Sequence, residues 1–179
     1  GTTRDTIEET LNIDGILFRF IDTAGLRETT ETVEKIGIER TFKKISEASI
    51  VLGMVDLTRD FETTCETVRE IIAKVDFNTQ KLVILLNKTD ISEVNNNVSI
   101  LNYIVSELDN KGVDWKAFKM EGIPSELESS PEKTTTTTGF TTTDIIPISA
   151  KTGTGINTLR SLLAATQRDL LADSDTTLV

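Results

Sequence analysis

Apolar runs of strand length alternate along this chain with segments of helical spacing, and this alternation limits the possible folds more than any other feature. Strand-like runs cover residues 7–13, 16–22, 50–56, 82–86 and 144–148. Apolar residues recur with helical spacing over residues 32–48, 62–75 and 98–109, and in a last segment beginning near Gly155. Strands that alternate with helices predict an α/β fold with a mostly parallel sheet.

The first two strand-like runs form an exception to the parallel arrangement. Only Asp14 and Gly15 separate residues 7–13 from residues 16–22. Asp-Gly between two strand-like runs is a strong signal for a β-hairpin, so we expect one antiparallel pair at the start of the chain. The later runs at 50–56 and 82–86 are continuously apolar, which is typical of strands buried on both faces.

Composition excludes several classes of function. The chain has 179 residues, which is the size of one ordinary domain. Its net charge of −10, with no Lys/Arg cluster, opposes binding of nucleic acid or anionic lipid by this chain itself. No apolar run approaches the ~20 residues that span a bilayer, and no secretory signal is visible, so we expect a cytoplasmic protein without a membrane partner. The lone Cys65 is expected to be an inert core thiol.

Two stretches lack the composition of a packed core. Residues 122–143 contain two prolines and the run Thr134–Thr138, which is typical of a flexible insertion. Residues 173–179 are expected to form a frayed tail. We therefore expect residues 1–172 to form one domain that carries a flexible Thr-rich insertion.

Three short polar motifs follow the ends of predicted strands. They are Asp22-Thr23-Ala24-Gly25, Asn87-Lys88-Thr89-Asp90 and Ser149-Ala150-Lys151. In open α/β sheets, ligands collect in the crevice at the carboxyl ends of the strands. The shared location of the motifs therefore predicts one binding site at that edge.

The motif at 22–25 has the chemistry of a magnesium and phosphate site. Asp22 supplies a hard carboxylate oxygen, which suits Mg²⁺ directly or through water. Gly25 allows the backbone to approach a phosphate, so that its N–H can donate to a terminal oxygen. Taken alone, this motif is equally compatible with an ordinary turn after a strand.

The other two strand-end motifs have the chemistry of guanine recognition. The carboxylate of Asp90 can accept from guanine N1–H and the exocyclic amine together, a donor pair that adenine lacks. Asn87 would tie the loop together, the stem of Lys88 can lie over the purine face, and the Ala150 N–H would meet guanine O6. Alone, each motif is also compatible with a polar loop or a helix cap at Ser149; together and in this order they favour a guanine site.

A fourth motif, Gly1-Thr2-Thr3-Arg4-Asp5, precedes the first strand. Thr3 could ligate magnesium and close over a γ-phosphate, although two threonines near a terminus are often just a disordered end. The four motifs in this order are those of a GTP-binding domain. No G-x-x-x-x-G-K-[S/T] phosphate loop occurs in the chain.

The stretch from Asp22 to Arg40 (DTAGLRETTETVEKIGIER) resembles the inserted G domain of the bacterial tRNA-modification GTPase MnmE (TrmE) family. The resemblance implies a Ras-like P-loop NTPase fold of three layers. It places Thr2 and Thr3 in the first switch and begins the second switch at Asp22. Glu34 matches the family's catalytic glutamate, which orients the attacking water indirectly. Without the resemblance, Glu34 would be an ordinary solvated carboxylate on an amphipathic helix.

The resemblance also implies cofactors and partners. Members of the family hydrolyse GTP to GDP with Mg²⁺ and K⁺, and their G domains form homodimers across the switch regions. They act with the flavoprotein MnmG to modify the wobble uridine of certain tRNAs. Magnesium would be held by Thr3 and Asp22, and tRNA would be bound only through other parts of the protein. The implied nucleotide-binding residues are Thr2, Thr3, Asp22, Thr23, Ala24, Gly25, Asn87, Lys88, Asp90, Ser149, Ala150 and Lys151.

This chain departs from the family pattern because the phosphate loop and the central first strand before it are missing from the sequence. We expect another segment to take the place of that strand, the hairpin to shift, or upstream residues to complete the sheet. Two alternatives to a GTPase domain of the MnmE family remain open. The chain could be a nucleotide-incompetent binding or dimerisation module, or the G domain of a ribosome-associated GTPase of the Der or Era type, against which the Glu34 region argues.

Overall fold

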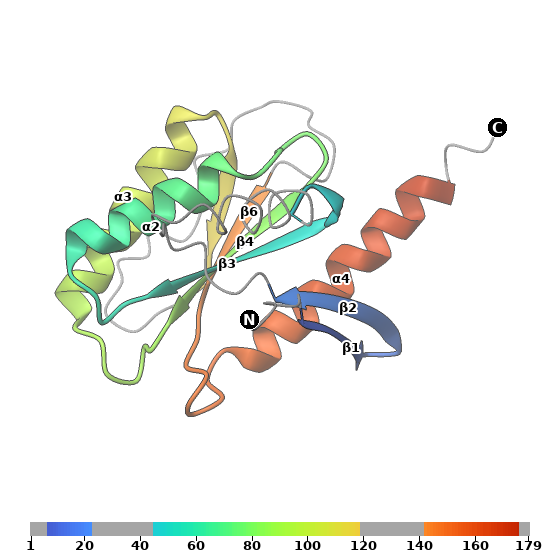
Figure 1. Cartoon of the computed structure of the whole chain (residues 1–179), viewed down its shortest axis with the longest axis horizontal. Coiled ribbons are helices and arrows are strands. Elements are labelled where there is room, and N and C mark those ends of the chain that lie inside the picture. Colours follow the sequence, from blue (N-terminus) through green and yellow to red (C-terminus); the bar gives the residue numbers. More distant parts are fainter. Residues whose placement is uncertain (1–6, 23–44, 119–141, 176–179) are drawn as a thin grey trace, which may run out of the picture. The chain divides into compact units, whose positions relative to one another are not determined.

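The computed structural model describes residues 7–22, 45–118 and 142–175 (Figure 1). The chain divides into two compact units, residues 1–48 and residues 49–179, and each is described by itself. The predicted helix at 32–48 falls almost entirely outside the described residues, as does the Thr-rich segment up to residue 141.

The first unit contains an antiparallel hairpin of β1 (Ile7–Ile13) and β2 (Ile16–Asp22). The turn residues have positive φ, 52° at Asp14 and 85° at Gly15. Positive φ at both central positions defines the type I′ turn, which an Asp-Gly pair adopts with little strain. The side chain of Asn12 also accepts a hydrogen bond from Gly15 N at 3.0 Å. The structure thus confirms the predicted hairpin and its bounds.

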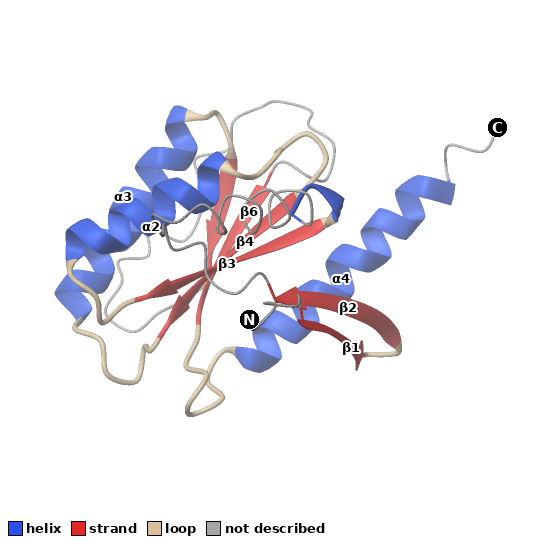
Figure 2. Ribbon diagram, in the orientation of Figure 1, coloured by secondary structure: helices blue, strands red, loops and turns tan. Residues whose placement is uncertain are grey.

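The second unit is built on a parallel sheet of four strands in the order β3-β4-β6-β5 (Figure 2). The strands are β3 (Ile50–Asp56), β4 (Lys81–Asn87), β5 (Asp114–Ala117) and β6 (Thr142–Pro147). The sequence predicted β3, β4 and β6 but missed β5, because four residues with one alternation of polar and apolar side chains give too short a pattern.

In the part of this unit that the structure describes, three helices cover the sheet: α2 (Phe61–Ala73), α3 (Val94–Asn110) and α4 (Ile156–Asp175). Helix α2 begins where the Asp60 carboxylate accepts from Thr63 N at 2.9 Å. Helix α3 begins four residues before the predicted start at 98, because its first turn holds three asparagines that obscure helical spacing. The side chain of Asn96 stabilises that turn by donating to Leu57 O at 3.1 Å.

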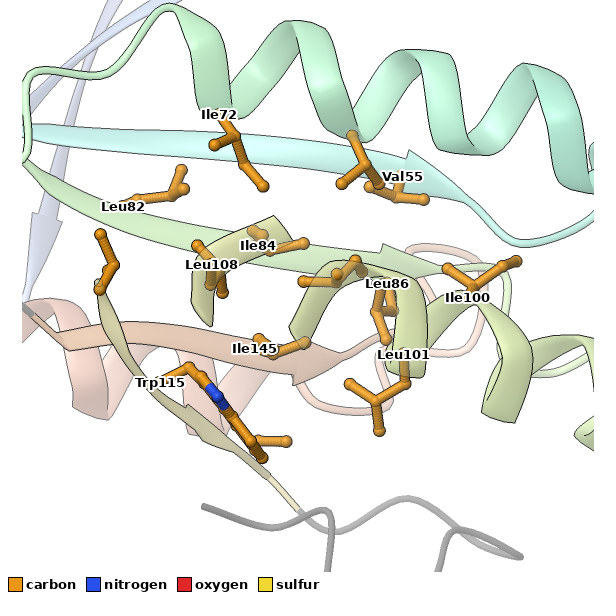
Figure 3. Packing of buried hydrophobic residues seen from close by; sticks show 14 of the residues in the cluster. Val55, Ile72, Leu82, Ile84, Leu86, Ile100, Leu101, Leu108, Trp115 and Ile145 are labelled. Atoms are coloured by element: carbon orange, nitrogen blue, oxygen red, sulfur yellow. The ribbon is translucent and has the colours of Figure 1, made fainter. Parts of the chain in front are cut away.

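The core lies on both faces of β4. Leu82, Ile84 and Leu86 point toward α2 and α3, where they join the larger apolar cluster (Figure 3). Val83 and Leu85 point to the opposite face, which α4 covers. Burial of six consecutive residues of β4 explains its continuously apolar sequence. Cys65 is buried and free, as predicted.

One ion pair is buried among these apolar residues. Lys81 Nζ, at the start of β4, lies 2.7 Å from Asp144 Oδ2 on β6, and the two side chains are 8% and 7% exposed. Lys81 Nζ also donates to Thr142 O. A buried ion pair contributes little net stability, but losing one partner would leave a buried charge unpaired. The pair therefore favours the observed alignment of β4 with β6.

Within the described residues, β1 and β2 pair with each other and β3 is an outer strand of the parallel sheet. None of the described helices combines the length and the apolar character needed to cross a membrane.

Gly155 is required where the chain enters α4. It has φ of 75°, and a Cβ there would lie 2.1 Å from the carbonyl oxygen of Pro147. Gly153, with φ of 82°, has open space around the same position. We expect Gly153→Ala to cost about 1–2 kcal/mol of unfolding free energy through backbone strain alone. Gly155→Ala should cost at least about 2 kcal/mol more, because the backbone itself must move.

Urea unfolding of the two variants measures this difference. Because both positions have positive φ, Gly153→Ala is the matched control for backbone strain. Equal losses of stability in the two variants would contradict the steric role of Gly155.

Candidate functional site

The strand register brings three of the polar segments to one edge of the sheet. Asp56 at the end of β3 is aligned with Asn87 at the end of β4, and Leu86 of β4 is aligned with Pro147 of β6. The loops that follow β4 and β6 are thus neighbours at the carboxyl edge. This is the location that the sequence predicted for a ligand site.

The Asn87 carboxamide joins the two loops. Its Oδ1 accepts from Lys88 N at 2.8 Å and from Ala150 N at 3.1 Å. Its Nδ2 lies 3.7 Å from the sulfur of Met54 on β3. Through these hydrogen bonds, Asn87 links the loop after β4 to the loop after β6. The Ala150 N–H, predicted to meet guanine O6, donates to Asn87 in this structure.

The buried hydroxyl of Ser149 orients the carboxylate of Asp90. Ser149 Oγ donates to Asp90 Oδ1 at 2.7 Å and accepts from Thr152 N at 3.1 Å. Ser149 is fully buried, whereas Asp90 is exposed. A hydrogen bond to a carboxylate is one of the stronger neutral-to-charged contacts, so it holds Asp90 in one orientation while leaving it accessible to solvent.

Thr89 is a further link between the loops that the sequence reasoning left without a role. Its backbone N and its Oγ1 both donate to the carbonyl oxygen of Ile148, at 3.2 and 3.0 Å. Ile148 N in turn donates to Leu86 O at 2.8 Å, which continues the β4–β6 pairing into the loops. These bonds bring Asp90 and Ser149 together although they are 59 residues apart in the sequence.

Lys88 has the left-handed backbone conformation, with φ of 70°. For a residue other than glycine this costs of the order of 1–2 kcal/mol and persists only where neighbouring contacts hold it. The contacts here are the bond from Lys88 N to Asn87 Oδ1 and the bonds from Ile91 N and Ser92 N to Lys88 O, both at 3.1 Å. The loop conformation is therefore set by its own hydrogen bonds.

Asp56 lies beside Lys88 and was not predicted as a site residue. Its Oδ2 lies 2.7 Å from Lys88 Nζ. Its Oδ1 accepts from Thr58 N at 3.0 Å and from Thr58 Oγ1 at 2.7 Å. The signal that could have found it is its position: like Asp22 and Asn87, it is the polar last residue of a strand.

The pKa of Asp56 reflects these contacts. Partial burial of the carboxyl acts to raise its pKa, but the hydrogen bonds from Lys88 and Thr58 and the charge of Lys88 outweigh burial and lower the pKa to about 2. The carboxylate is therefore ionised throughout the physiological range, and its ion pair with Lys88 is intact there.

The structure brings together Asn87, Lys88, Asp90, Ser149 and Ala150, and it places Lys151 next to them as an exposed residue. Asp22 is the last residue of β2 and belongs to the first unit. The other predicted site residues, Thr2, Thr3, Thr23, Ala24, Gly25 and Glu34, lie outside the described residues. Across the described ranges, no group of three or more His, Cys, Asp or Glu residues is placed to hold a metal ion.

The assembled loops have the chemistry to select a planar base. They present an oriented carboxylate acceptor at Asp90 beside the Ala150 N–H, which donates to Asn87 Oδ1, and the β4 loop also carries the aliphatic stem of Lys88. A site built around such a hydrogen-bond pattern rejects a ligand that leaves its polar groups unpaired.

Comparison with known proteins supports a class for this chain. The family model described as 50S ribosome-binding GTPase matches residues 1–88. A GTP-binding protein from the hyperthermophilic archaeon Sulfolobus solfataricus, solved in complex with GDP, has a similar fold with a TM-score of 0.61. The similarity covers 92% of this chain and 45% of that protein, at 16% sequence identity. The chain thus has a mostly parallel α/β fold like that of this GTP-binding protein, and its first 88 residues match the GTPase family model.

Curated relatives narrow the class further. The chain is 50% identical over 93 residues to the tRNA modification GTPase MnmE of Bacteroides thetaiotaomicron. It is 53% identical over 92 residues to MnmE of Parabacteroides distasonis. Over about half of its length, the chain is thus similar in sequence to proteins named tRNA modification GTPase MnmE. The matched segments cover 52% and 51% of this chain but 20% and 19% of those proteins, so the chain spans about a fifth of their length.

The lowered pKa of Asp56 predicts a pH dependence of stability. Because the folded-state pKa of about 2 lies below the ordinary value of 3.8, the carboxylate stabilises the fold above pH 3.8, and this contribution is lost as the pH falls toward 2. The Asp56 side chain is 31% exposed, so screening reduces the contribution to about 1 kcal/mol.

Denaturant unfolding at pH 6 and at pH 2 measures this contribution. Asp56→Asn should be less stable than the unsubstituted chain at pH 6, and the difference should shrink at pH 2. A difference that is independent of pH would contradict the assignment.

Proposed function

We propose that this chain binds guanine nucleotides through the loops that follow β4 and β6. The observation that carries the proposal is the 2.7 Å hydrogen bond from the buried Ser149 hydroxyl to the Asp90 carboxylate. It joins two motifs that the sequence separates, and it orients the one side chain with the acceptor geometry that distinguishes guanine from adenine.

Recognition would proceed through complementary donors and acceptors. Asp90 would accept from guanine N1–H and the exocyclic amine, and adenine would leave its carboxylate unpaired. Guanine O6 would accept from the Ala150 N–H, which it would take over from Asn87 Oδ1. The stem of Lys88 would cover one face of the purine, with Ser149 and Lys151 completing the loop beside it.

The phosphates and metal would be handled by residues of the N-terminal part. Asp22 and Thr3 offer the hard carboxylate and hydroxyl oxygens that suit Mg²⁺, and their donor chemistry fits that ion. Bound there, Mg²⁺ would neutralise phosphate charge. The backbone of Thr23, Ala24 and Gly25 would donate to the terminal phosphate, with Thr2 and Thr3 closing over it. Glu34 would orient the attacking water indirectly, and K⁺ would be a second cation of the reaction.

The whole protein would couple GTP hydrolysis to tRNA modification. The relatives named tRNA modification GTPase MnmE support this proposal. The substrate would be the wobble uridine of certain tRNAs, modified together with the flavoprotein MnmG in the cytoplasm, and G domains would form homodimers. The net charge of −10 argues that tRNA would be bound by parts other than this chain.

The first test is a titration of the full-length protein with a fluorescent GDP analogue in the presence of Mg²⁺ and K⁺. We expect saturable binding that excess GTP displaces and excess ATP does not, because only guanine satisfies Asp90. Displacement by ATP as effective as displacement by GTP would contradict the assignment of the base-reading loops.

A substitution at Asp90 tests the base contact directly. Asp90→Asn should weaken GDP binding at least about 100-fold, because the negative charge is lost and an amide donor replaces one of the two acceptor oxygens. The same variant should gain affinity for xanthosine diphosphate, since the Asn amide can donate to the 2-oxo group of xanthine. Competition titrations measure both effects.

Asp109→Asn at the end of α3 is the matched control, because it removes the same charge away from the loops. We expect the control to bind GDP like the unsubstituted protein. Unchanged preference for guanine in Asp90→Asn would overturn the proposed function.

A further inference from the structure

The carboxylate of Asp56 uses its two oxygens for two different partners. Oδ1 accepts from the backbone N and the hydroxyl of Thr58, at 3.0 and 2.7 Å. Oδ2 is left for the ammonium group of Lys88, at 2.7 Å. Because Thr58 holds one oxygen, the direction of the other is set by the turn that follows β3. Asp56 is thus an oriented anion rather than a freely rotating surface carboxylate.

The position of Asp56 places this anion at the site. Its strand partner in the parallel register is Asn87, the residue directly before Lys88. Leu57 N also donates to Asn87 O at 3.2 Å, so the ends of β3 and β4 are joined by a backbone hydrogen bond as well. The ion pair therefore joins the last residue of β3 to the residue directly after β4.

Lys88 has a backbone that is already held in one conformation, but a lysine side chain retains many rotamers when its end is free. The side chains of Lys88 and Asp56 are 44% and 31% exposed. Because so much of the Lys88 side chain lies in solvent, its surroundings alone would not restrict its rotamers. An ion pair to an oriented anion selects the rotamers that extend the stem from β4 toward the end of β3.

We propose that Asp56 is a positioning residue for nucleotide binding, which holds the aliphatic stem of Lys88 in place to cover the purine face. The inference rests on the proposed function, because it assigns Asp56 a task within the same guanine site. Asp56 itself does not touch the base. Its contribution is to restrict Lys88 before the nucleotide arrives, so that less side-chain entropy is lost on binding.

Two other roles for Asp56 predict different results. If Asp56 only stabilises the turn with Thr58, its loss would lower stability without a specific effect on binding through Lys88. If the ion pair instead keeps Lys88 away from the base, its loss would strengthen binding. Nucleotide affinity and stability, measured together, separate these roles from positioning.

Asp56→Asn in the full-length protein is the central variant, because it keeps an oxygen acceptor toward Thr58 and places an amide donor against the Lys88 ammonium. We expect its affinity for the fluorescent GDP analogue to fall about tenfold, an effect of the size that a lost charge-assisted contact produces. Asp60→Asn is the matched control. It removes the same charge at the N-cap of α2, where Asn is an equally good cap, and should change affinity less than about twofold.

A double-mutant cycle with Lys88→Met tests whether Asp56 acts through Lys88. Methionine keeps an unbranched apolar stem but cannot pair with Asp56. In the Lys88→Met background, Asp56→Asn should change GDP affinity less than about twofold, because the partner that Asp56 positions is gone. A loss of affinity that persists undiminished in this background would overturn the inference.

Base selectivity distinguishes loss of positioning from general damage to the site, because general damage would change the selectivity. Asp56→Asn should keep the ratio of GDP to inosine diphosphate affinity, because Asp90 and Ser149 are untouched and the purine face is common to both bases. A changed ratio, an unchanged GDP affinity or a stronger GDP affinity would each overturn the inference while leaving the proposed function in place. Failure of Asp90→Asn to alter base preference would instead overturn the proposed function, and this inference with it.

Discussion

The arrangement of the site depends on the burial of β4 on both faces. Because its residues alternate between the α2/α3 cluster and the α4 cluster, β4 cannot shift by one residue without exchanging the two apolar sets. The ion pair between Lys81 and Asp144 at the start of the strand adds a second reason for the same alignment. With β4 held in this way, Asn87 and Lys88 must emerge at the carboxyl edge beside the ends of β3 and β6.

From that edge, polar side chains turn neighbouring loops into one site. Asn87 accepts from Ala150 N, Thr89 donates to Ile148 O, and Ser149 donates to Asp90. Each bond crosses from the β4 loop to the β6 loop. On the other side of β4, the ion pair between Asp56 and Lys88 joins the end of β3 to the β4 loop. Contacts of this kind hold a binding loop in one geometry before the ligand arrives, which reduces the cost of binding.

The comparisons with known proteins and the contacts in the structure support the functional assignment of different parts of the chain. The family match covers residues 1–88 and ends within the β4 loop. The Ser149 loop lies beyond it, and its assignment rests on the contacts with Asp90 and Asn87. The two lines of support meet at Asn87 and Lys88, which belong to both.

Much of the fold could be predicted from the sequence because local rules were sufficient. Asp14-Gly15 predicted the hairpin turn, and the apolar runs at 50–56 and 82–86 predicted β3 and β4 within one residue of their observed bounds. Strand β5 and the first turn of α3 were missed. Four residues carry too little periodicity to identify a strand. The asparagines at the start of α3 are weak helix formers, and one of them, Asn96, is held by a tertiary hydrogen bond to Leu57 O.

The sequence by itself determined the types of residue that end the strands and the order of the motifs, because polar residues after buried apolar runs must lie at the sheet edge. It therefore identified Asn87, Asp90 and Ser149 as candidates. Only the tertiary structure decided that Ser149 donates to Asp90, that Ala150 donates to Asn87 and that Asp56 pairs with Lys88. These contacts join residues that are tens of positions apart, and their geometry follows from the register of parallel strands, which no local pattern records.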